Sequence, residues 1–327
     1  MDTYESVKQK MNKGLFPATP IPFNSKGSID VNSHMKYVNY IKNEPISGVA
    51  VWAHTGRGLL IDDETRDYVL CSFREALPDK LIIAGVGADI NKFKDKENFE
   101  SQYISQAIKM AQRAKELNAD AIMVYAPNIF KGQEDQDKKI IEYHKEIAKV
   151  GLPIILFYLY EEAGGISYSY NVLNELLNMK EIIGIKVATL DSIMTYQYIS
   201  SYIQKNYEDK LLITGEDRML GYTLMRGAKA SLIGLGCACT KLQKDLMESY
   251  YHGHFDRFIN LSLKVDKLAE CTFIDPMEGY IKRMLTVLGI LGIIPMEATY
   301  DPFGPISELS LDEIRHIEGV LKEIDCI

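Results

Sequence analysis

The sequence lacks long hydrophobic runs, basic clusters and a secretory start. Its apolar stretches reach only about five to eight residues, far short of the ~20 that a membrane-spanning helix needs. The net charge is −8, and Lys and Arg are scattered among acidic residues, which argues against a nucleic-acid partner. The N-terminus shows no basic segment followed by an apolar one. We therefore expect neither a membrane nor a nucleic acid as a partner.

Cysteine is scarce as well, with five residues in 327. An odd number without a secretory signal predicts reduced thiols and a cytoplasmic location. His252 and His254 are close in sequence, but no cysteine or acidic cluster completes a metal-binding set, so no metal site is predicted. No histidine accompanies a serine or cysteine in a nucleophile motif, and a hydrolase triad therefore has no support.

What the sequence does contain is an alternation of short apolar runs and longer amphipathic ones. The amphipathic runs predict helices, for example from Asp30, from Asp62 or Asp63, and from Asp191. Eight strand–helix units within about 240 residues predict a (β/α)8 TIM barrel, an α/β fold. The predicted strands are Leu15–Ala18, Ser47–Ala53, Leu81–Gly85, Ala119–Tyr125, Pro153–Leu159, Glu181–Lys186, Leu211–Thr214 and Ala230–Gly234.

The remaining segment, residues 241–327, has helical patterns throughout. We expect it to form a C-terminal helical extension that packs on the barrel of residues 1–240 within the same structural unit. A doubly wound sheet is the main alternative. It is disfavoured because no G-x-G-x-x-G follows the first strand, and the run from Gly85 to Asp89 lacks the third glycine.

The sixth predicted strand ends in Lys186, after Gly184 and Ile185. Strand alternation would place Ile183 and Ile185 on one face and Gly184 and Lys186 on the other. Burial disfavours the ammonium form of a lysine and lowers its pKa, which leaves neutral amine able to attack a carbonyl and form an imine. The alternative is a lysine at a strand end whose head reaches water.

Two more strand ends carry polar groups, and active sites in (β/α)8 barrels lie at those ends. Strand two leads into His54-Thr55-Gly56-Arg57, where amide groups and a hydroxyl would form a carboxylate cradle, or simply a turn. Strand five carries Tyr158, whose phenol would move protons during imine chemistry, unless it is a core aromatic.

Together these residues resemble the dihydrodipicolinate synthase and N-acetylneuraminate lyase superfamily. The similarity rests on Gly-Ile-Lys at a strand end 28 residues after Tyr158, on the Thr-Gly turn, and on the opening G-L-F-P-A-T-P-x-P-F. It extends from about Lys13 to Met296. The resemblance implies a homo-oligomer, a tetramer or dimer, and a reaction that needs no cofactor, since the protonated imine is itself the electron sink.

The resemblance also implies roles for individual residues. Lys186 would be the Schiff-base lysine and Tyr158 the catalytic phenol, while Thr55 and the Gly56 amide would hold the carboxylate of a 2-oxo acid. Ile233 matches a strand-eight residue whose carbonyl lines the pocket. Counting back from Lys186 without a gap places Tyr158 at the phenol position, whereas a one-residue gap would place Phe157 there.

The chain departs from the superfamily pattern at several points. The usual turn G-T-T-G-E reads Ala-His-Thr-Gly-Arg here, so His54 and Arg57 replace a hydroxyl and an acid. The position near Asn128 lacks the second tyrosine of the synthases. Glu161 and Glu162 stand where synthases carry an arginine that grips the second substrate.

These departures predict a change of partner substrate. Acids near the pocket favour hydroxyl groups and repel a second carboxylate. We expect a lyase, an aldolase or a dehydratase, that joins or cleaves pyruvate or another 2-oxo acid with a hydroxylated or neutral aldehyde, and His54 would contact the distal chain. The alternative is a barrel that binds a keto acid or sugar acid without turnover.

Overall fold

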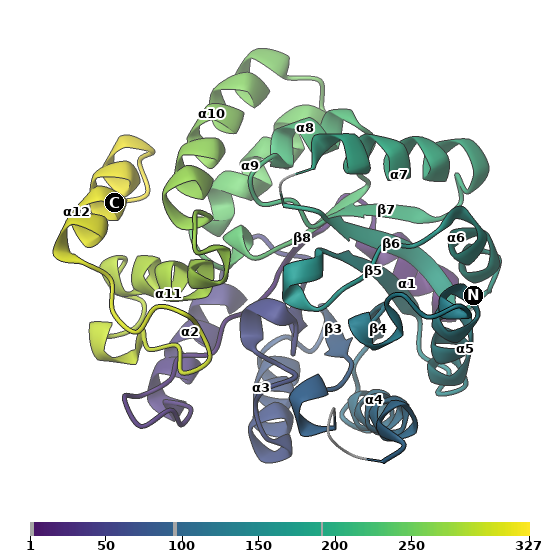
Figure 1. Ribbon diagram of the computed structural model, residues 1–327. Coiled ribbons are helices and arrows are strands. Elements are labelled where there is room, and N and C mark those ends of the chain that lie inside the picture. The colour runs from purple at the N-terminus through teal and green to yellow at the C-terminus, as the bar shows by residue number, and fades with distance from the viewer. Residues whose placement is uncertain (1–2, 94–96, 191) are drawn as a thin grey trace.

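The computed structural model describes residues 3–93, 97–190 and 192–327. Within them, eight parallel strands form one sheet in the order β1-β8-β7-β6-β5-β4-β3-β2 (Figure 1). The strands are β1 (Leu15–Pro17), β2 (Gly48–Val51), β3 (Leu81–Val86), β4 (Ala121–Tyr125), β5 (Ile154–Leu159), β6 (Ile182–Ala188), β7 (Leu211–Thr214) and β8 (Ala230–Ile233). A parallel bridge between Ala18 and Ala50 joins β1 to β2 and nearly closes the barrel. The predicted (β/α)8 fold is confirmed.

Helices alternate with the strands and surround the sheet (Figure 1). A first helix, α1 (Thr3–Met11), precedes β1 and was not predicted. The helices between and after the strands are α2 (Val31–Lys42), α3 (Asp63–Ala76), α4 (Phe99–Glu116), α5 (Gln136–Ala148), α6 (Tyr170–Leu177), α7 (Ile193–Asn206), α8 (Leu220–Met225) and α9 (Thr240–Tyr251). The C-terminal helices are α10 (Phe255–Thr272), α11 (Tyr280–Ile290) and α12 (Leu311–Glu323).

Two predicted helix starts are visible as side-chain caps. The carboxylate of Asp30 accepts a hydrogen bond from the Ser33 amide at the start of α2, and Asp62 accepts one from Thr65 at the start of α3. The predicted start at Asp191 lies outside the described residues. Strand β6 runs past Lys186 to Ala188, so Lys186 lies inside the strand rather than at its end.

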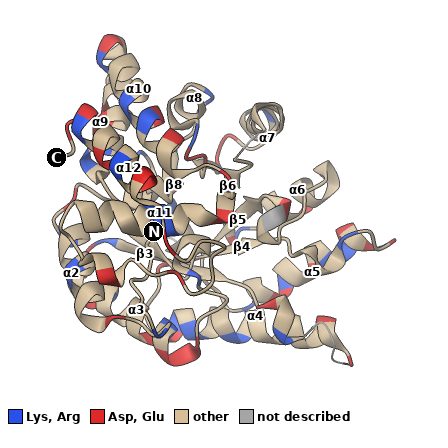
Figure 2. Ribbon diagram, turned by 60° about the vertical axis from the view of Figure 1, so that its left-hand side comes forward, with Lys and Arg blue, Asp and Glu red and all other residues tan. Residues whose placement is uncertain are grey.

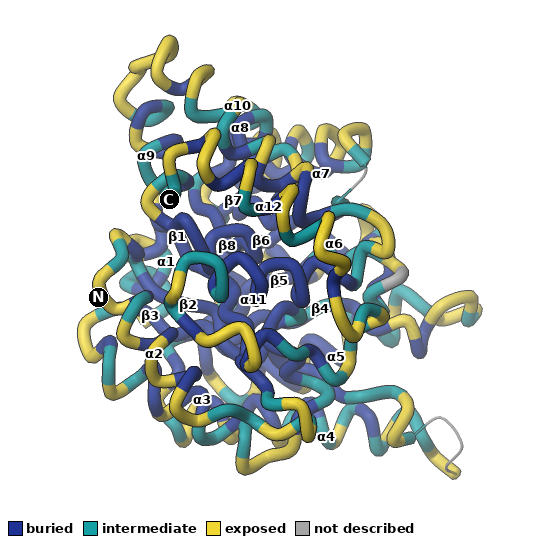
Figure 3. Tube along the Cα trace, turned by 90° about the vertical axis from the view of Figure 1, so that its left-hand side faces the viewer, coloured by how far each residue is buried: buried dark blue, intermediate teal, exposed yellow. Residues whose placement is uncertain are grey.

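The strands separate an inner core from an outer one. The outer core lies between sheet and helices, and the buried strands appear as the dark centre of Figure 3. Helix α1 contributes Val7 and Met11 to the inner core and contacts β3 and β6. Each strand contributes to the inner core, through Phe16, Ala50, Ile83, Met123, Ile155, Ile183, Ile213 and Leu232.

The C-terminal segment packs closely on the barrel. Helix α10 contacts α8 and α9, and α12 contacts α10. Because α9 directly follows β8, it continues the strand–helix alternation, whereas α10 to α12 are additional. The division into residues 1–240 and 241–327 within one structural unit remains a prediction.

Charges and exposed residues lie mainly on the outer helices. Basic and acidic residues are interspersed along α4, α5 and α12 (Figure 2). Among the described residues, no helix is both long and apolar enough to cross a bilayer.

Candidate active site

Lys186 lies in the barrel interior, where β6 carries it. Its side chain is enclosed, with a residue exposure of 6%, and Nζ lies 4.0 Å from the centroid of the Phe157 ring. Burial lowers the pKa of Lys186 to about 8, although the charges of Asp217 and Glu216 act in the opposite direction. A substantial share of neutral amine is therefore present near neutral pH, as attack on a carbonyl requires.

The pairing of β5 with β6 contains an irregularity that decides which side chains face Lys186. Ile154 pairs with Ile182, but the next residue, Ile155, pairs with Gly184, so Ile183 is an extra residue in β6. Ile183 belongs to the inner core and Ile185 to the outer core. The prediction that Ile183 and Ile185 share a face was therefore wrong, because this bulge interrupts the alternation.

The same irregularity separates Tyr158 from Lys186. Phe157 is the register partner of Lys186 and belongs to the inner core. Tyr158 packs on the outer core, where its hydroxyl lies 2.8 Å from Oγ of Ser167 and its ring lies against Tyr168. The expected position of Tyr158 beside Lys186 was wrong, because a shift of one residue moves a side chain to the other face of a strand.

Two consecutive acids, Glu216 and Asp217, follow β7, and their charges act on the amine of Lys186. Glu216 accepts hydrogen bonds from the amides of Thr189 (2.6 Å) and Leu190 (2.8 Å), and Oδ1 of Asp217 accepts one from the Leu235 amide at 2.6 Å. Burial raises the pKa of both acids to about 7, against the effect of these hydrogen bonds. We made no functional prediction for either acid, although their place after a predicted strand was a usable signal.

The turn after β2 is a short 3-10 helix, His54–Gly56. Thr55 is buried, and its Oγ1 lies 2.9 Å from the phenol oxygen of Tyr280 on α11. The Gly56 amide donates to the carbonyl of Ala53 at 3.0 Å. A Cβ on Gly56 would lie 2.7 Å from the carbonyl oxygen of Thr19, so the close approach of the β1 loop requires glycine.

Ile233 ends β8, one residue before the predicted end of that strand at Gly234, and its side chain lies in the outer core. Its carbonyl accepts a hydrogen bond from the Ala18 amide at 2.9 Å and so helps to hold the segment after β1. Ile233 does not contribute to the lining of the cavity described below.

His54 belongs to a network centred on Glu278, which precedes α11. His54 Nε2 lies 2.8 Å from Oε1 of Glu278, and the Tyr160 hydroxyl donates to the same oxygen at 2.5 Å. Nη1 of Arg57 donates to Oε2 of Glu278 at 2.9 Å, and Nη2 donates to the buried Asp301 at 2.8 Å. The positive charge of Arg57 and the negative charge of Glu278 are thus each paired with an opposite charge.

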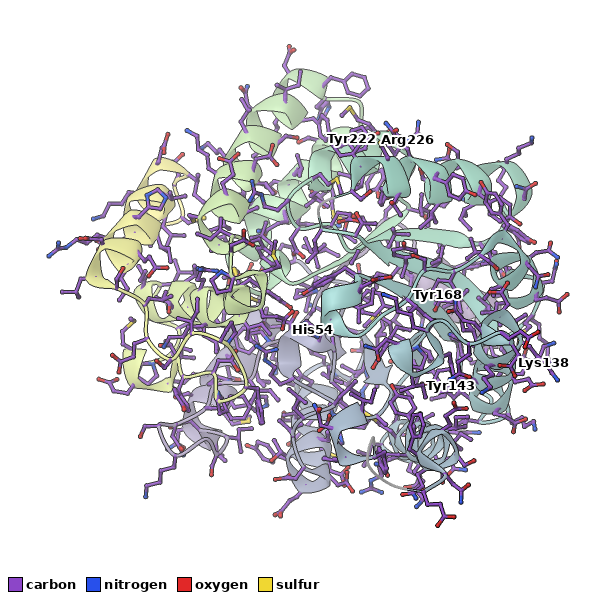
Figure 4. The ribbon with its side chains drawn as sticks, viewed as in Figure 1. His54, Lys138, Tyr143, Tyr168, Tyr222 and Arg226 are labelled. Atoms are coloured by element: carbon purple, nitrogen blue, oxygen red, sulfur yellow. The ribbon has the colours of Figure 1, made fainter. Side chains whose placement is uncertain are left out.

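The network sets the charge state of Glu278. Burial raises its pKa, but the hydrogen bonds and charges of His54, Tyr160 and Arg57 outweigh burial and lower the pKa to about 2. His54 lies near the centre of the view in Figure 4, where the C-terminal segment meets the barrel. His54 therefore pairs with Glu278.

A cavity of about 380 Å³ opens at the carboxyl ends of β2 to β5. Its lining includes His54, Arg57, Asn91, Asn128, Phe157 and Glu278. Phe157 borders the cavity and also lies against Lys186, so one ring contacts both. This position at the strand ends is where the barrel fold places active sites.

Two acids border this cavity, Asp89 and Glu278, and neither is one of the two glutamates that the sequence indicated. Glu161 pairs with Lys131, and both side chains are more than half exposed. The side chain of Glu162 lies outside the described part of the structure. Glu278 supplies the acid near the pocket that was expected from Glu161 and Glu162. The sequence did not indicate it, because it lies more than a hundred residues further along the chain.

Within residues 3–93, 97–190 and 192–327, no group of three or more His, Cys, Asp or Glu side chains could hold a metal ion. His252 and His254 lie near each other, with ring centroids 6.1 Å apart, but without a third ligand.

The sequence profile of the dihydrodipicolinate synthetase family matches residues 11–319. The chain belongs to the dihydrodipicolinate synthetase family. A curated relative, the 4-hydroxy-tetrahydrodipicolinate synthase of Bartonella tribocorum, is 26% identical over 319 residues, which cover 95% of this chain and 100% of that protein. The predicted family membership is thereby confirmed.

Solved structures of this family share the fold. N-acetylneuraminate lyase from Mycoplasma synoviae matches with a TM-score of 0.76 at 22% identity. The alignment covers 96% of this chain and 98% of the lyase chain. A monomeric dihydrodipicolinate synthase variant has a TM-score of 0.83 at 18% identity, with full coverage of both chains. At these identities the similarity concerns the barrel and its C-terminal helices rather than a substrate.

Proposed function

We propose that this protein is a lyase that forms a Schiff base between Lys186 and pyruvate or another 2-oxo acid. The observation that carries the proposal is a buried lysine inside the barrel, with its pKa lowered to about 8, in a member of this family. The imine would act as an electron sink for making or breaking a carbon–carbon bond, or for dehydration, without a cofactor.

Thr55 is the proposed ligand for the carboxylate of the 2-oxo acid. Its hydroxyl is buried at the carboxyl end of β2, on the same side of the barrel as the cavity. The Gly56 amide, proposed as a second donor, would share its hydrogen between the Ala53 carbonyl and the substrate. The Ile233 carbonyl would have to share its bond from Ala18 in the same way. Gly56 and Ile233 are therefore weaker candidates for substrate contacts than Thr55.

The distal part of the cavity favours a hydroxylated or neutral partner over a second carboxylate. Arg57 is already paired with Glu278 and Asp301, so it offers no free charge to an anion. Glu278 is ionised and repels another carboxylate, while it can accept hydrogen bonds from hydroxyl groups. We propose a polyhydroxylated 2-oxo acid or a neutral aldehyde as partner, with His54 contacting its chain.

Borohydride reduction in the presence of pyruvate tests the imine. The expected result is an intact-mass increase that peptide mapping assigns to Lys186 and that is absent in Lys186→Ala. No adduct, or an adduct that persists in Lys186→Ala, would refute the proposal. A barrel that only binds a keto acid, the alternative function, would bind pyruvate by calorimetry without giving an adduct.

A panel of 2-oxo sugar acids, and of aldehydes supplied with pyruvate, tests the partner. Turnover is expected with hydroxylated or neutral compounds, and Glu278→Gln should reduce the preference for them. Best turnover with aspartate semialdehyde would contradict the argument. Unchanged kinetics in His54→Ala would show that His54 does not contact the partner substrate.

We also propose that the protein forms homo-oligomers in the cytoplasm. The five cysteines, all within the described residues, are free, as expected in a reducing compartment. Met284, Leu285 and Leu288 on α11 are buried within the chain itself, so they do not provide a surface for association. Phe255, Ile259 and Leu263 form an exposed apolar row on α10 instead. Light scattering that shows a monomer at micromolar concentration would contradict association.

A further inference from the structure

Two cysteines that are far apart in the sequence meet beside the C-terminal helices. Cys239 directly precedes α9, and Cys326 follows α12. Both border a cavity of about 610 Å³, which shares no lining residue with the cavity at the strand ends in the described structure. Their two thiols are hydrogen-bonded to each other. The fold therefore brings a pair of thiols into contact outside the candidate active site.

The packing of the C-terminal helices returns Cys326 to the start of α9. Helix α12 packs on α10, and α10 packs on α9. After α12 the chain turns at Asp325, whose φ is 60°, and the Cys326 amide donates to the carbonyl of Leu321 at 2.9 Å. Nζ of Lys264 on α10 donates to the Asp325 carboxylate at 2.5 Å. These contacts hold the segment that carries Cys326 against α10.

The two thiols differ in exposure and in acidity. Cys239 is buried, whereas Cys326 is partly exposed at the cavity. The hydrogen bond from Cys239 lowers the pKa of the Cys326 thiol against the effect of burial, and the charge of Lys264 also lowers it. The same hydrogen bond, together with burial, raises the pKa of Cys239. Because the thiolate is the reactive form of cysteine, Cys326 is the member of the pair that reacts first.

The remaining three cysteines have different surroundings. Cys237 is fully buried, and burial raises the pKa of its thiol. Sγ of Cys271 donates to the carbonyl of Leu268 at 3.2 Å, and burial raises its pKa to about 11. Cys71 is exposed on α3. A partly exposed thiol with a hydrogen-bonded second thiol is thus found, among the described residues, at Cys326.

We propose that Cys326 and Cys239 form a peroxide-reactive pair, in which Cys326 is oxidised first and Cys239 completes a disulfide. The Cys326 thiolate attacks one oxygen of hydrogen peroxide, the O–O bond breaks, and the departing hydroxide takes up the proton that the thiol had lost and becomes water. Cys326 is then a sulfenic acid. Cys239 loses its proton and attacks Sγ of Cys326, the S–O bond breaks, and hydroxide leaves with that proton as water. Two thiols are oxidised and one peroxide is reduced to two water molecules.

The disulfide links the end of α12 to the start of α9 and closes residues 239–326 into a covalent loop. Thiols of a reducing compartment reverse such a bond by exchange, so the link forms under peroxide and disappears afterwards. The pair is therefore a reversible modification site, and its chemistry is independent of imine formation at Lys186.

Peroxide treatment of the reduced wild-type protein tests the proposal. The protein is treated with hydrogen peroxide, denatured, alkylated and digested without reduction. Alkylation should fall from five thiols per chain to three, because the disulfide consumes two. Peptide mapping should find Cys239 joined to Cys326 within one chain, and dithiothreitol should restore all five thiols. Five alkylated thiols after peroxide, a disulfide between other cysteines, or a link between two chains would overturn the proposal.

Serine variants test the order of the two steps. In Cys239→Ser the sulfenic acid should persist, and dimedone, which labels sulfenic acids, should mark Cys326. Cys326→Ser should lose the disulfide and should give no dimedone label at Cys239. Cys71→Ser is the matched control, since it removes an exposed thiol elsewhere, and it should form the disulfide at the wild-type rate. A label on Cys239 in Cys326→Ser equal to that on Cys326 in Cys239→Ser would contradict the assigned order. The wild-type mapping decides whether the pair reacts even where a variant does not fold.

Discussion

Phe157 lies against the amine of Lys186, with Nζ 4.0 Å from the ring centroid. The ring has two opposing effects. It helps to exclude water, which favours the neutral amine, and its face attracts the cation, which favours the ammonium. Because burial is the larger influence, the pKa of Lys186 falls to about 8 rather than staying near 10.5.

The first prediction concerns the pH dependence of imine formation. The neutral amine is the nucleophile, so the trapping rate with pyruvate should rise with pH and level off above about 8, where Lys186 has lost its proton. The measurement is the trapping rate from pH 6 to 9.5. A rate that still climbs at the upper end of this range would indicate an unperturbed lysine.

Asp217→Asn provides a second prediction. The negative charge of Asp217 holds the pKa of Lys186 up, so its removal should lower that pKa and move the trapping profile to lower pH. The asparagine oxygen can still accept the hydrogen bond from the Leu235 amide, so the local geometry should persist. The same pH series measures the shift, and a shift to higher pH would contradict the assigned sign.

A third prediction uses Gly215, which lies directly beside the lysine. A Cβ there would lie 2.4 Å from Cε of Lys186, so Gly215→Ala must displace the amine-bearing chain. We expect a loss of about 100-fold in trapping rate, the order of effect known for a misplaced catalytic group, with a destabilisation of about 1–3 kcal/mol from overpacking.

Gly319→Ala is the matched control for that substitution. Gly319 lies in α12, and a Cβ there would have no neighbour within 4 Å. Alanine favours a helix over glycine by up to about 1 kcal/mol. This variant should therefore be slightly more stable and should trap pyruvate at the wild-type rate.

The fourth prediction concerns stability in acid. The folded-state pKa of Glu278, about 2, lies below its ordinary value of 4.5. The folded protein thus binds fewer protons there than the unfolded chain, so the stabilisation is complete above pH 4.5 and is lost as the pH falls toward 2. It amounts to roughly 3 kcal/mol.

Denaturant unfolding of wild type and Glu278→Gln at pH 6 and pH 3 measures this contribution. The difference in stability between the two proteins should be large at pH 6 and smaller at pH 3. Glu161→Gln serves as control, because the exposed Glu161–Lys131 pair should contribute at most about 1 kcal/mol. An equal difference at both pH values would refute the assigned pKa.

Local sequence determined much of this protein. The apolar runs and capping residues sufficed for the barrel, because strand and helix periodicity depends on neighbours along the chain. The family pattern around Gly184-Ile185-Lys186 identified the lysine that the fold buries. Thr55 and His54 were found at a strand end for the same reason, since the carboxyl ends of barrel strands form the site.

Tertiary structure decided what surrounds that lysine. The bulge at Ile183 arises from the pairing of β5 with β6, and it alone determines that Phe157, and not Tyr158, faces Lys186. Glu278 and Tyr280 reach His54 and Thr55 across more than two hundred residues of chain. Such contacts depend on how the C-terminal segment packs against the strand ends, and nothing in the local sequence of either partner specifies them.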